Sequence, residues 1–326
     1  MSAGSVTDRM LRWQVPLYLG ALAAGAAAGF LLPASRGVFA ASVTPALVLL
    51  LYATFLAVPF HRLRAAFRDL RFLTAVLVLN FVIVPVVVFV LSRVLAPHDA
   101  LLVGVLFVLL TPCVDYVISF GRLAGGAADH LLAVTPVLML GQLTLLPLFV
   151  RLMAGPEIAS VIAIGPFLEA FVLLIVVPLA AAALTQWAAA RWRSAHVLVR
   201  TMDGAMVPLM MLTLAVVVAS HSYAIVEEGT VLLTAVPVFV VFLIVMPVFG
   251  AGVGRLWRQD VPATRALVFS GATRNSLVVL PLALALPEPL ALAALVVVTQ
   301  TVVELIGMVA YVRIVPRIVR SRRARD

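Results

Sequence analysis

Residues 109–115 read Leu-Leu-Thr-Pro-Cys-Val-Asp and lie inside an apolar segment that is long enough to cross a bilayer. Within four positions this stretch holds a helix-breaking proline, Pro112, the only cysteine of the chain, Cys113, and a carboxylate, Asp115. A proline within a membrane helix frees backbone carbonyls that other groups must satisfy. A carboxylate within the bilayer is costly, so its first interpretation is functional. We expect the rest of the chain to hold this broken helix against a matching one.

The composition is typical of a polytopic membrane protein and not of a soluble domain. Of the 326 residues, 64% are hydrophobic and 11% are charged, and the mean hydropathy is +1.19. The formal charge of +9 arises from 23 arginines without any lysine, and arginines that set topology explain it better than nucleic-acid binding. The single cysteine excludes an internal disulfide. Neither a CxxC-type metal cluster nor a zinc pattern of histidines is present, so no cofactor is expected.

Hydropathy predicts ten membrane spans, at about 14–33, 39–60, 72–95, 100–124, 129–153, 161–187, 202–222, 230–254, 263–286 and 289–314. Nineteen of the arginines fall on one side of these spans, and the positive-inside rule places that side, with both termini, in the cytoplasm. The first apolar run is too long for a signal peptide, so we expect an uncleaved helix of a plasma-membrane protein. The four tryptophans fall at the cytoplasmic boundary, as interfacial anchors do; they are Trp13, Trp187, Trp192 and Trp257.

The two halves of the chain, 1–154 and 155–326, resemble each other as repeats. Three weak matches share an offset of 161–163 residues: 44–47 with 207–210, 81–84 with 242–245, and Gln142 with Glu304. Five spans per repeat is an odd number, so the repeats must be inverted in the membrane. The predicted fold is all-α, with discontinuous helices four and nine crossing. Spans 3–5 and 8–10 would form a core bundle, and spans 1, 2, 6 and 7 a panel.

The ninth span is the second interrupted segment. Residues 269–277 read Phe-Ser-Gly-Ala-Thr-Arg-Asn-Ser-Leu, and Pro281 follows. The repeat offset pairs Cys113 with Asn275. Interrupted segments at corresponding places in two halves indicate a binding site near the membrane midplane.

Side chains of the fourth, ninth and tenth spans could carry chemistry. Cys113 is either a buried hydrophobe or a soft ligand whose deprotonation Arg274 would ease. Asp115 and Arg274 are expected to pair, as a structural staple or as a gate. Glu304 is either a proton carrier or a tolerated glutamate that faces the bundle interior. Asn275, with neighbouring hydroxyl and amide side chains, could bind solute or join helices.

No phosphate-binding loop, ATPase motif or nucleophile–base pair is present, so the chain is not expected to be an enzyme. Energy would come from an ion gradient or from the gradient of the solute. A sensor or scaffold is disfavoured because every predicted loop is short.

At this point the residues resemble a known family. Ten spans with breaks in the fourth and ninth are similar to the bile acid/sodium symporter superfamily. Pro112-Cys113, Asn275 and Glu304 resemble its arsenite efflux permease branch, across about residues 14–315. The resemblance implies that Cys113 and Glu304 are essential for arsenite export, usually in exchange for protons.

The match departs from that branch in spans four and nine. In span nine Arg274 replaces the first of two asparagines, and the glutamate that follows them in that branch is absent. In span four Asp115 stands at an alanine-like position, so the chain resembles a divergent arsenic resistance subgroup. The bile-acid-type symporters carry a polar sequence motif in span nine that helps to hold sodium. When this motif is aligned on Asn275, its glutamate corresponds to Ser270 and its glutamine to Arg274. Such a changed site is a poor sodium site.

The prediction is therefore an exporter of arsenite, with antimonite as a related solute, that contacts its small inorganic solute through Cys113. Asn275, Arg274 and Asp115 would line the site, and Glu304, with Asp115, would exchange the proton. The alternative is ion-coupled uptake of an organic anion whose carboxylate binds Arg274. The oligomeric state stays open.

Overall fold

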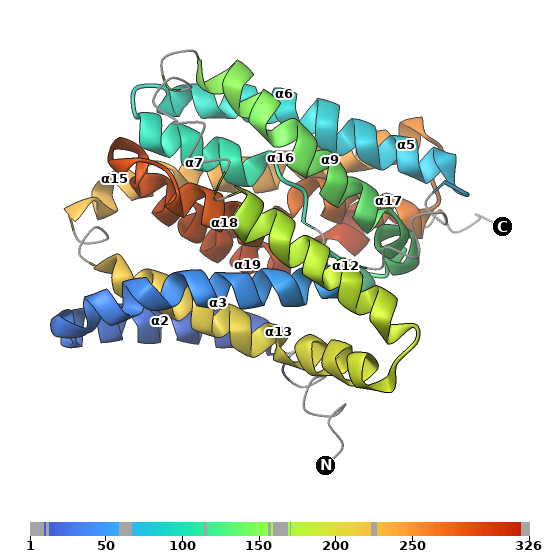
Figure 1. The fold of residues 1–326 in the computed structure, drawn as a ribbon. Helices are drawn as coiled ribbons and strands as arrows, with labels where there is room; N and C mark the ends of the chain where they lie inside the picture. The colour runs from blue at the N-terminus through green and yellow to red at the C-terminus, as the bar shows by residue number, and fades with distance from the viewer. Residues whose placement is uncertain are drawn as a thin grey trace.

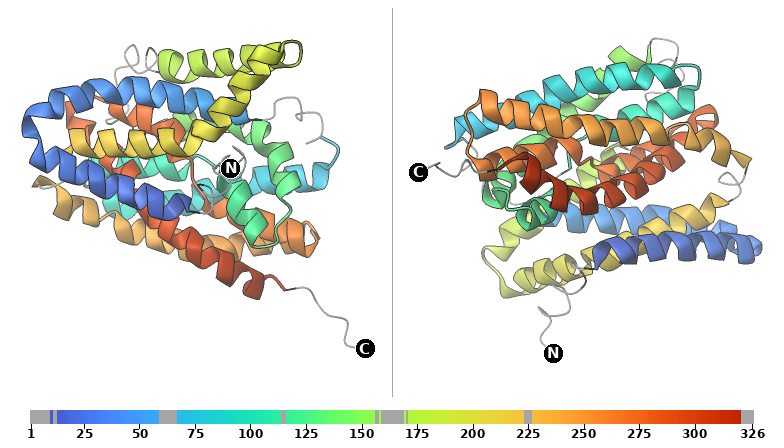
Figure 2. Two further views of the ribbon diagram at one scale, coloured as in Figure 1. Left: turned by 90° about the horizontal axis from the view of Figure 1, so that it is seen from below. Right: turned by 180° about the vertical axis from the view of Figure 1, so that it is seen from behind.

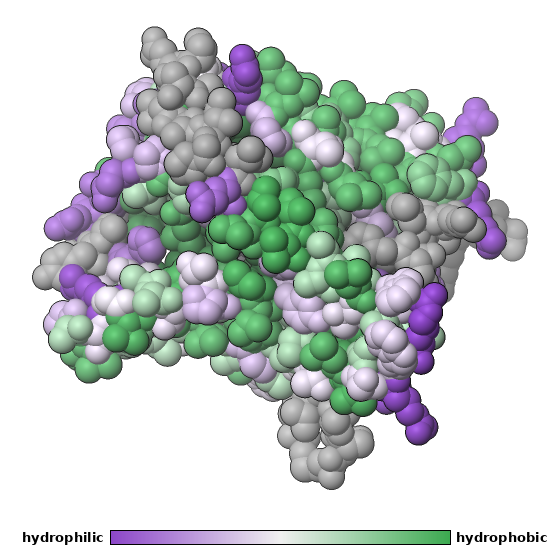
Figure 3. All heavy atoms as spheres, viewed as in Figure 1, coloured by the Kyte–Doolittle hydropathy of each residue, from purple (hydrophilic) through white to green (hydrophobic). Residues whose placement is uncertain are grey.

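The structure is a computed structural model that describes residues 10, 13–58, 67–113, 116–155, 158, 169, 171–222 and 227–320. Within these ranges the regular structure is helical, apart from one isolated β-bridge. Figure 3 shows apolar residues across the middle of one face and hydrophilic residues toward its two ends. Among the described residues, eight helical segments are long and apolar enough to cross a membrane: Gln14–Leu31, Pro33–Ala57, Leu70–Leu95, Ala128–Ala154, Val172–Ala189, Arg193–Ser220, Gly229–Leu256 and Glu288–Ile318.

The helices form two layers (Figure 1). One layer contains α2 (Gln14–Leu31), α3 (Arg36–Ala57), α12 (Val177–Ala189) and α13 (Arg193–Ser220). The other contains α5 (Leu70–Val78), the π-helix η3 (Leu79–Ile83), α6 (Val84–Ser92), α7 (Asp99–Leu109), α8 (Tyr116–Leu123), α9 (Ala128–Ala154), α15 (Gly229–Leu233), α16 (Val236–Leu256), α17 (Val261–Ala272), α18 (Ser276–Leu284) and α19 (Leu292–Ile318). The view from behind in Figure 2 shows the same arrangement. Helix α18 packs on α3 and α19 packs on α2, so these contacts join the layers.

The predicted fourth and ninth spans are each divided into two short helices. Helix α7 ends at Leu109 and α8 begins at Tyr116, with Pro112 in the gap. Helix α17 ends at Ala272 and α18 begins at Ser276. Both helix interruptions are therefore present where the sequence predicts them.

Other span boundaries differ from the prediction. Helix α13 begins at Arg193 instead of 202, and α19 continues to Ile318 instead of ending at 314. Hydropathy marks the apolar part of a helix, whereas the helical hydrogen bonds continue into the polar region beyond it. In the predicted span 161–187, most residues before 171 lie outside the described residues, and the described helix runs over Val172–Ala189.

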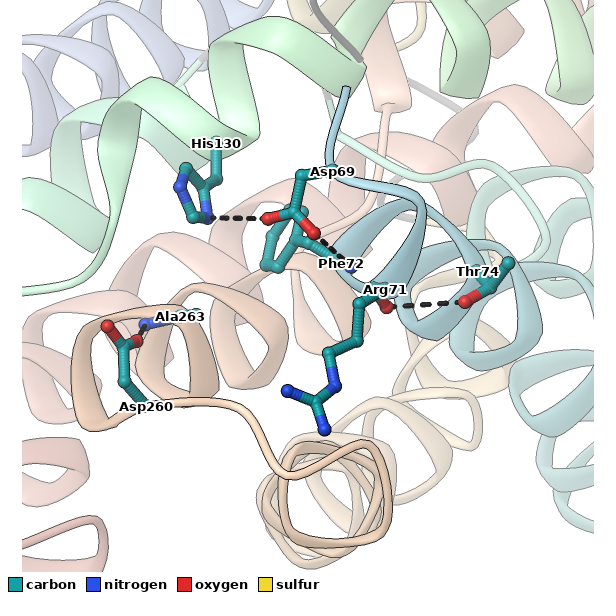
Figure 4. A network of polar contacts seen from close by, with 7 residues as sticks. All are labelled: Asp69, Arg71, Phe72, Thr74, His130, Asp260 and Ala263. Atoms are coloured by element: carbon teal, nitrogen blue, oxygen red, sulfur yellow. Dashed lines mark hydrogen bonds and ion pairs between the residues drawn. The ribbon is translucent and has the colours of Figure 1, made fainter. Parts of the chain in front are cut away.

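Helices α5 and α17 begin with aspartate caps at one end of the molecule (Figure 4). We call it the arginine-rich end because arginines lie at or shortly before the starts of these helices: Arg68, Arg71, Arg255 and Arg258. The Asp69 carboxylate accepts from the Phe72 N–H at 3.0 Å, and the Asp260 carboxylate accepts from the Ala263 N–H at 2.8 Å. These bonds satisfy N–H groups that have no partner within the helix. The His130 Nδ1 lies 3.7 Å from an Asp69 oxygen, so α9 contacts the start of α5.

Two glycines allow the half-helices α7 and α17 to approach their neighbours closely. A Cβ added at Gly104 of α7 would lie 2.7 Å from the Val296 Cβ of α19. A Cβ added at Gly250 of α16 would lie 2.7 Å from the Val268 Cα of α17. Small residues let membrane helices approach in this way. The close contacts fix both half-helices on continuous helices.

Candidate functional site

The two helix breaks meet in an antiparallel β-bridge, in which Arg274 lies opposite the proline of the first break. The Cys113 N–H donates to the Thr273 carbonyl at 3.1 Å, and the Asn275 N–H donates to the Thr111 carbonyl at 2.8 Å. Backbone groups in a bilayer have no water to bind, so each break satisfies groups of the other. We call residues 111–113 and 273–275 the crossing.

The Arg274 side chain is fully buried and binds the ends of two half-helices. Leu109 is the last residue of α7, and Ser270 and Gly271 lie in the last turn of α17. Carbonyls at a helix C-terminus lack partners within the helix and carry partial negative charge. The guanidinium donates to the carbonyls of Leu109 at 3.3 Å, Ser270 at 2.6 Å and Gly271 at 2.8 Å, and to the Asn80 Oδ1 at 2.9 Å.

These bonds explain how a buried arginine is tolerated. A charge at the centre of a membrane helix costs about 2.5–3.5 kcal/mol on insertion scales. A hydrogen bond to a charged group contributes about 1.5–3 kcal/mol, so a few such bonds offset the cost. The Phe242 ring adds a cation–π contact, with its centroid 5.6 Å from the Arg274 Cζ. The charge is accommodated only while both half-helices stay in place.

Asn80 is a site residue that the sequence analysis missed. It lies in the π-helix η3, and its side-chain amide donates to the Val76 carbonyl and to the Ser270 hydroxyl, each at 3.0 Å. Its Oδ1 accepts from Arg274. Asn80 is the one amide side chain in the predicted third span, and that signal could have marked it. Single π-helical turns often occur at functional sites.

Glu304 of α19 is fully buried against the crossing. Its Oε2 accepts from the backbone N–H of Arg274 at 2.8 Å and from the Gln300 Nε2 at 2.5 Å. The peptide group that carries this N–H also carries the Thr273 carbonyl, which accepts from the Cys113 N–H. One peptide group therefore joins the backbone of Cys113 to the carboxylate of Glu304.

Four of the five predicted site residues come together in the structure. Cys113, Arg274, Asn275 and Glu304 are each at most 2% exposed and lie in or against the crossing. Asp115 lies outside the described residues, and so does its predicted contact with Arg274.

Three buried side chains beside the crossing have polar atoms without a hydrogen-bond partner in the described ranges. They are the Asn275 Nδ2, the Ser276 Oγ and the Gln300 Oε1. The other amide atom of Asn275 caps α18 by accepting from the Val278 N–H at 3.3 Å. Leaving a buried polar group unpaired costs about 1–3 kcal/mol. Together the three atoms offer a donor, a hydroxyl and an acceptor to a small polar solute.

This polar group lies at the boundary between the two layers. Leu277 and Leu305 follow Ser276 and Glu304 directly in sequence. Both leucines belong to an apolar cluster that draws its other buried members from the opposite layer: Tyr18, Leu50, Val207, Met210 and Leu214. The polar atoms therefore lie beside the apolar contact between the two layers.

Interrupted helices that meet at a buried polar site, within a bundle of membrane-spanning length, define a secondary transporter of the membrane. The sequence comparison agrees, because residues 44–228, more than half of the chain, match the Sodium Bile acid symporter family. The chain belongs to this family and is a multi-pass membrane protein. This confirms the superfamily that the sequence motifs resemble. No curated protein matches the chain.

The Arg274 contacts predict different effects for two buried amide residues. Asn80→Leu removes an acceptor from the guanidinium, so the free energy of unfolding should fall by about 2 kcal/mol. Gln142 is equally buried, but neither of its amide atoms has a partner in the described part of the chain. Gln142→Leu should be neutral or stabilising. Denaturant unfolding in one detergent compares the two variants, and equal losses would contradict the role given to Asn80.

Proposed function

We propose that this protein exports arsenite, and antimonite as a related solute, by alternating access in exchange for protons. The observation that carries the proposal is the Thr273–Arg274 peptide group, which is hydrogen-bonded to Cys113 on one side and to Glu304 on the other. The backbone of the only cysteine and the carboxylate of Glu304 are thus bound to the same peptide group. Family membership supports a secondary transporter, and we add the solute and the coupling ion.

The Cys113 thiol would bind trivalent arsenic. One As–S bond would form and one As–O bond would break, and the thiol proton would leave with the hydroxyl as water. The reverse reaction with water would release the solute. A single thiol suits transport because a cage of several thiolates would trap the solute. The unpaired atoms of Asn275, Ser276 and Gln300 would bind the remaining hydroxyls.

Glu304 would carry the exchanged proton, and Asp115 would assist it. The ionised carboxylate of Glu304 accepts two hydrogen bonds at Oε2, one from the crossing and one from Gln300. Protonation removes charge from this acceptor and weakens both bonds. Because the Arg274 N–H belongs to the peptide that also holds Cys113, the proton would loosen the solute site.

The architecture that we propose has ten spans in two inverted repeats, 1–154 and 155–326. Each half contains one interrupted helix, and the long helices α3 and α13 each contain an internal proline, Pro45 and Pro208. The layer of α2, α3, α12 and α13 would be the panel, and the other layer would be the moving core. The arginine-rich end and both termini would face the cytoplasm across the plasma membrane.

Uptake of an organic anion is the second candidate, and the name of the family favours it. It requires Arg274 to bind the carboxylate of the solute. The guanidinium is fully buried and donates to helix carbonyls and to Asn80, which weighs against this use. Anion uptake that thiol reagents do not inhibit would favour the second candidate.

Everted membrane vesicles test the solute. Vesicles with the wild-type protein should accumulate arsenite and antimonite when their lumen is acidic, and a collapsed pH gradient should stop this. Cys113→Ser should lower the initial rate by about tenfold or more, because the soft ligand is lost. Adding Ser92→Cys to that variant restores a buried thiol outside the crossing, at the last residue of α6, and should not rescue transport. A Cys113→Ser variant with wild-type transport activity would contradict the proposal that the Cys113 thiol binds the solute.

Replacement of Glu304 by glutamine tests the coupling ion. The amide oxygen of Glu304→Gln can still accept from the Arg274 N–H, but the side chain no longer takes up a proton. Accumulation driven by a pH gradient should be lost, while exchange of labelled for unlabelled arsenite at equal pH should continue. Glu288→Gln, which changes an exposed carboxylate, is the control. Gradient-driven accumulation by Glu304→Gln at the wild-type level would exclude Glu304 as the proton carrier.

The proposed pair of Asp115 and Arg274 is tested by a double-mutant cycle. If the side chains pair, Asp115→Asn and Arg274→Gln together should destabilise the protein less than the sum of the single changes, by about 1–3 kcal/mol. Additive unfolding energies would contradict pairing. If the pair is a structural staple, the double variant should regain transport together with stability. If the pair is a gate, transport by the double variant should stay impaired.

A further inference from the structure

In the part of the chain that the structure describes, the Arg274 guanidinium donates hydrogen bonds to four oxygen atoms, which we call the oxygen cage. They are the Leu109 carbonyl at the end of α7, the Ser270 and Gly271 carbonyls at the end of α17, and the Asn80 Oδ1 of η3. All four are neutral amide-type oxygens. Two half-helices thus direct their partially negative C-terminal ends at one buried positive charge.

The oxygen cage has the chemistry of a site for a small hard cation. Carbonyl and amide oxygens are ligands that hard cations prefer. In transporters with broken helices, unwound carbonyls and half-helix C-terminal ends coordinate sodium. The family that contains this chain is named for sodium symport. Here, however, the side chain of the protein itself supplies the positive charge.

We propose that Arg274 is a tethered cation that occupies the place of a bound sodium ion at the crossing. Its charge is present at every stage of transport, so the crossing needs no bound cation to stay joined. Removing the guanidinium should uncover a site that a sodium ion can fill. This inference rests on the proposed function only in assuming alternating access, and it does not depend on arsenite.

A second arginine shows what an ordinary carbonyl cap looks like in this chain. The Arg265 guanidinium donates to the carbonyls of Ala124 and Val319 at 3.0–3.1 Å, at the arginine-rich end. Arg265 is only half-buried, and it binds the ends of α8 and α19, where solvent can replace it. Arg274 is fully buried, and the Phe242 ring lies against its guanidinium. The two residues therefore form a matched pair for experiment.

Thermal unfolding of the purified protein in sodium chloride and in choline chloride, at equal ionic strength, tests the proposal. Cys113 is the only thiol and is 1% exposed, so a thiol-reactive fluorophore reports unfolding. Wild-type protein should unfold at the same temperature in both salts. Arg274→Gln should unfold earlier in choline, and sodium should raise its midpoint by about 3 °C or more with saturable dependence. Arg265→Gln should lose stability equally in both salts.

The outcomes separate a tethered cation from a simple cap. If sodium does not stabilise Arg274→Gln, or stabilises Arg265→Gln equally, the proposal is overturned. Should Arg274→Gln fail to fold in every salt, the wild-type protein and Arg274→Lys decide. Unfolding midpoints that do not change with sodium support the proposal, and a sodium-dependent midpoint or sodium-dependent wild-type transport refutes it. Because the unfolding assay contains no arsenite, its result is independent of the solute proposed above.

Discussion

The hydrogen bonds from the Arg274 guanidinium to the ends of α7 and α17 hold together two helices that the sequence interrupts. A broken helix in lipid leaves carbonyls that water cannot reach, and each break alone would be costly. The crossing removes this cost by pairing the two breaks and by placing a positive charge between their negative ends. Each interrupted helix therefore depends on the other to satisfy its backbone groups.

The same constraint explains where the polar groups lie. Asn80 of η3 binds the guanidinium of Arg274, and Glu304 of α19 binds its backbone N–H. The unpaired atoms of Asn275, Ser276 and Gln300 then lie beside the boundary between the layers. The layers meet there through the leucine, valine, methionine and tyrosine side chains of the apolar cluster. A rigid polar centre beside an apolar contact suits a family of membrane transporters.

The sequence predicts the positions of both breaks because proline and polar residues, such as Pro112 and Asn275, are costly inside an apolar span unless the helix is interrupted there. It does not predict the partners. Hydropathy indicates whether a residue prefers lipid or water, but it does not indicate which way the side chain points. It therefore cannot show that Arg274 turns toward carbonyl oxygens and Asn80. The Glu304 contact uses a backbone N–H, which no side-chain pattern reveals. The early start of α13 at Arg193 is missed because a helix continues beyond its apolar part.

The crossing also sets an order for the synthesis of the protein. The Thr111 hydroxyl and the Asn275 carbonyl that it contacts are 164 residues apart in sequence. When α7 and α8 enter the membrane, the residues that complete their interruption have not yet been made. The nascent first half must therefore hold its open backbone groups against water, lipid or the insertion machinery until α17 arrives. The last interrupted helix closes the fold, so a chain truncated before it loses the partner of its first interruption as well.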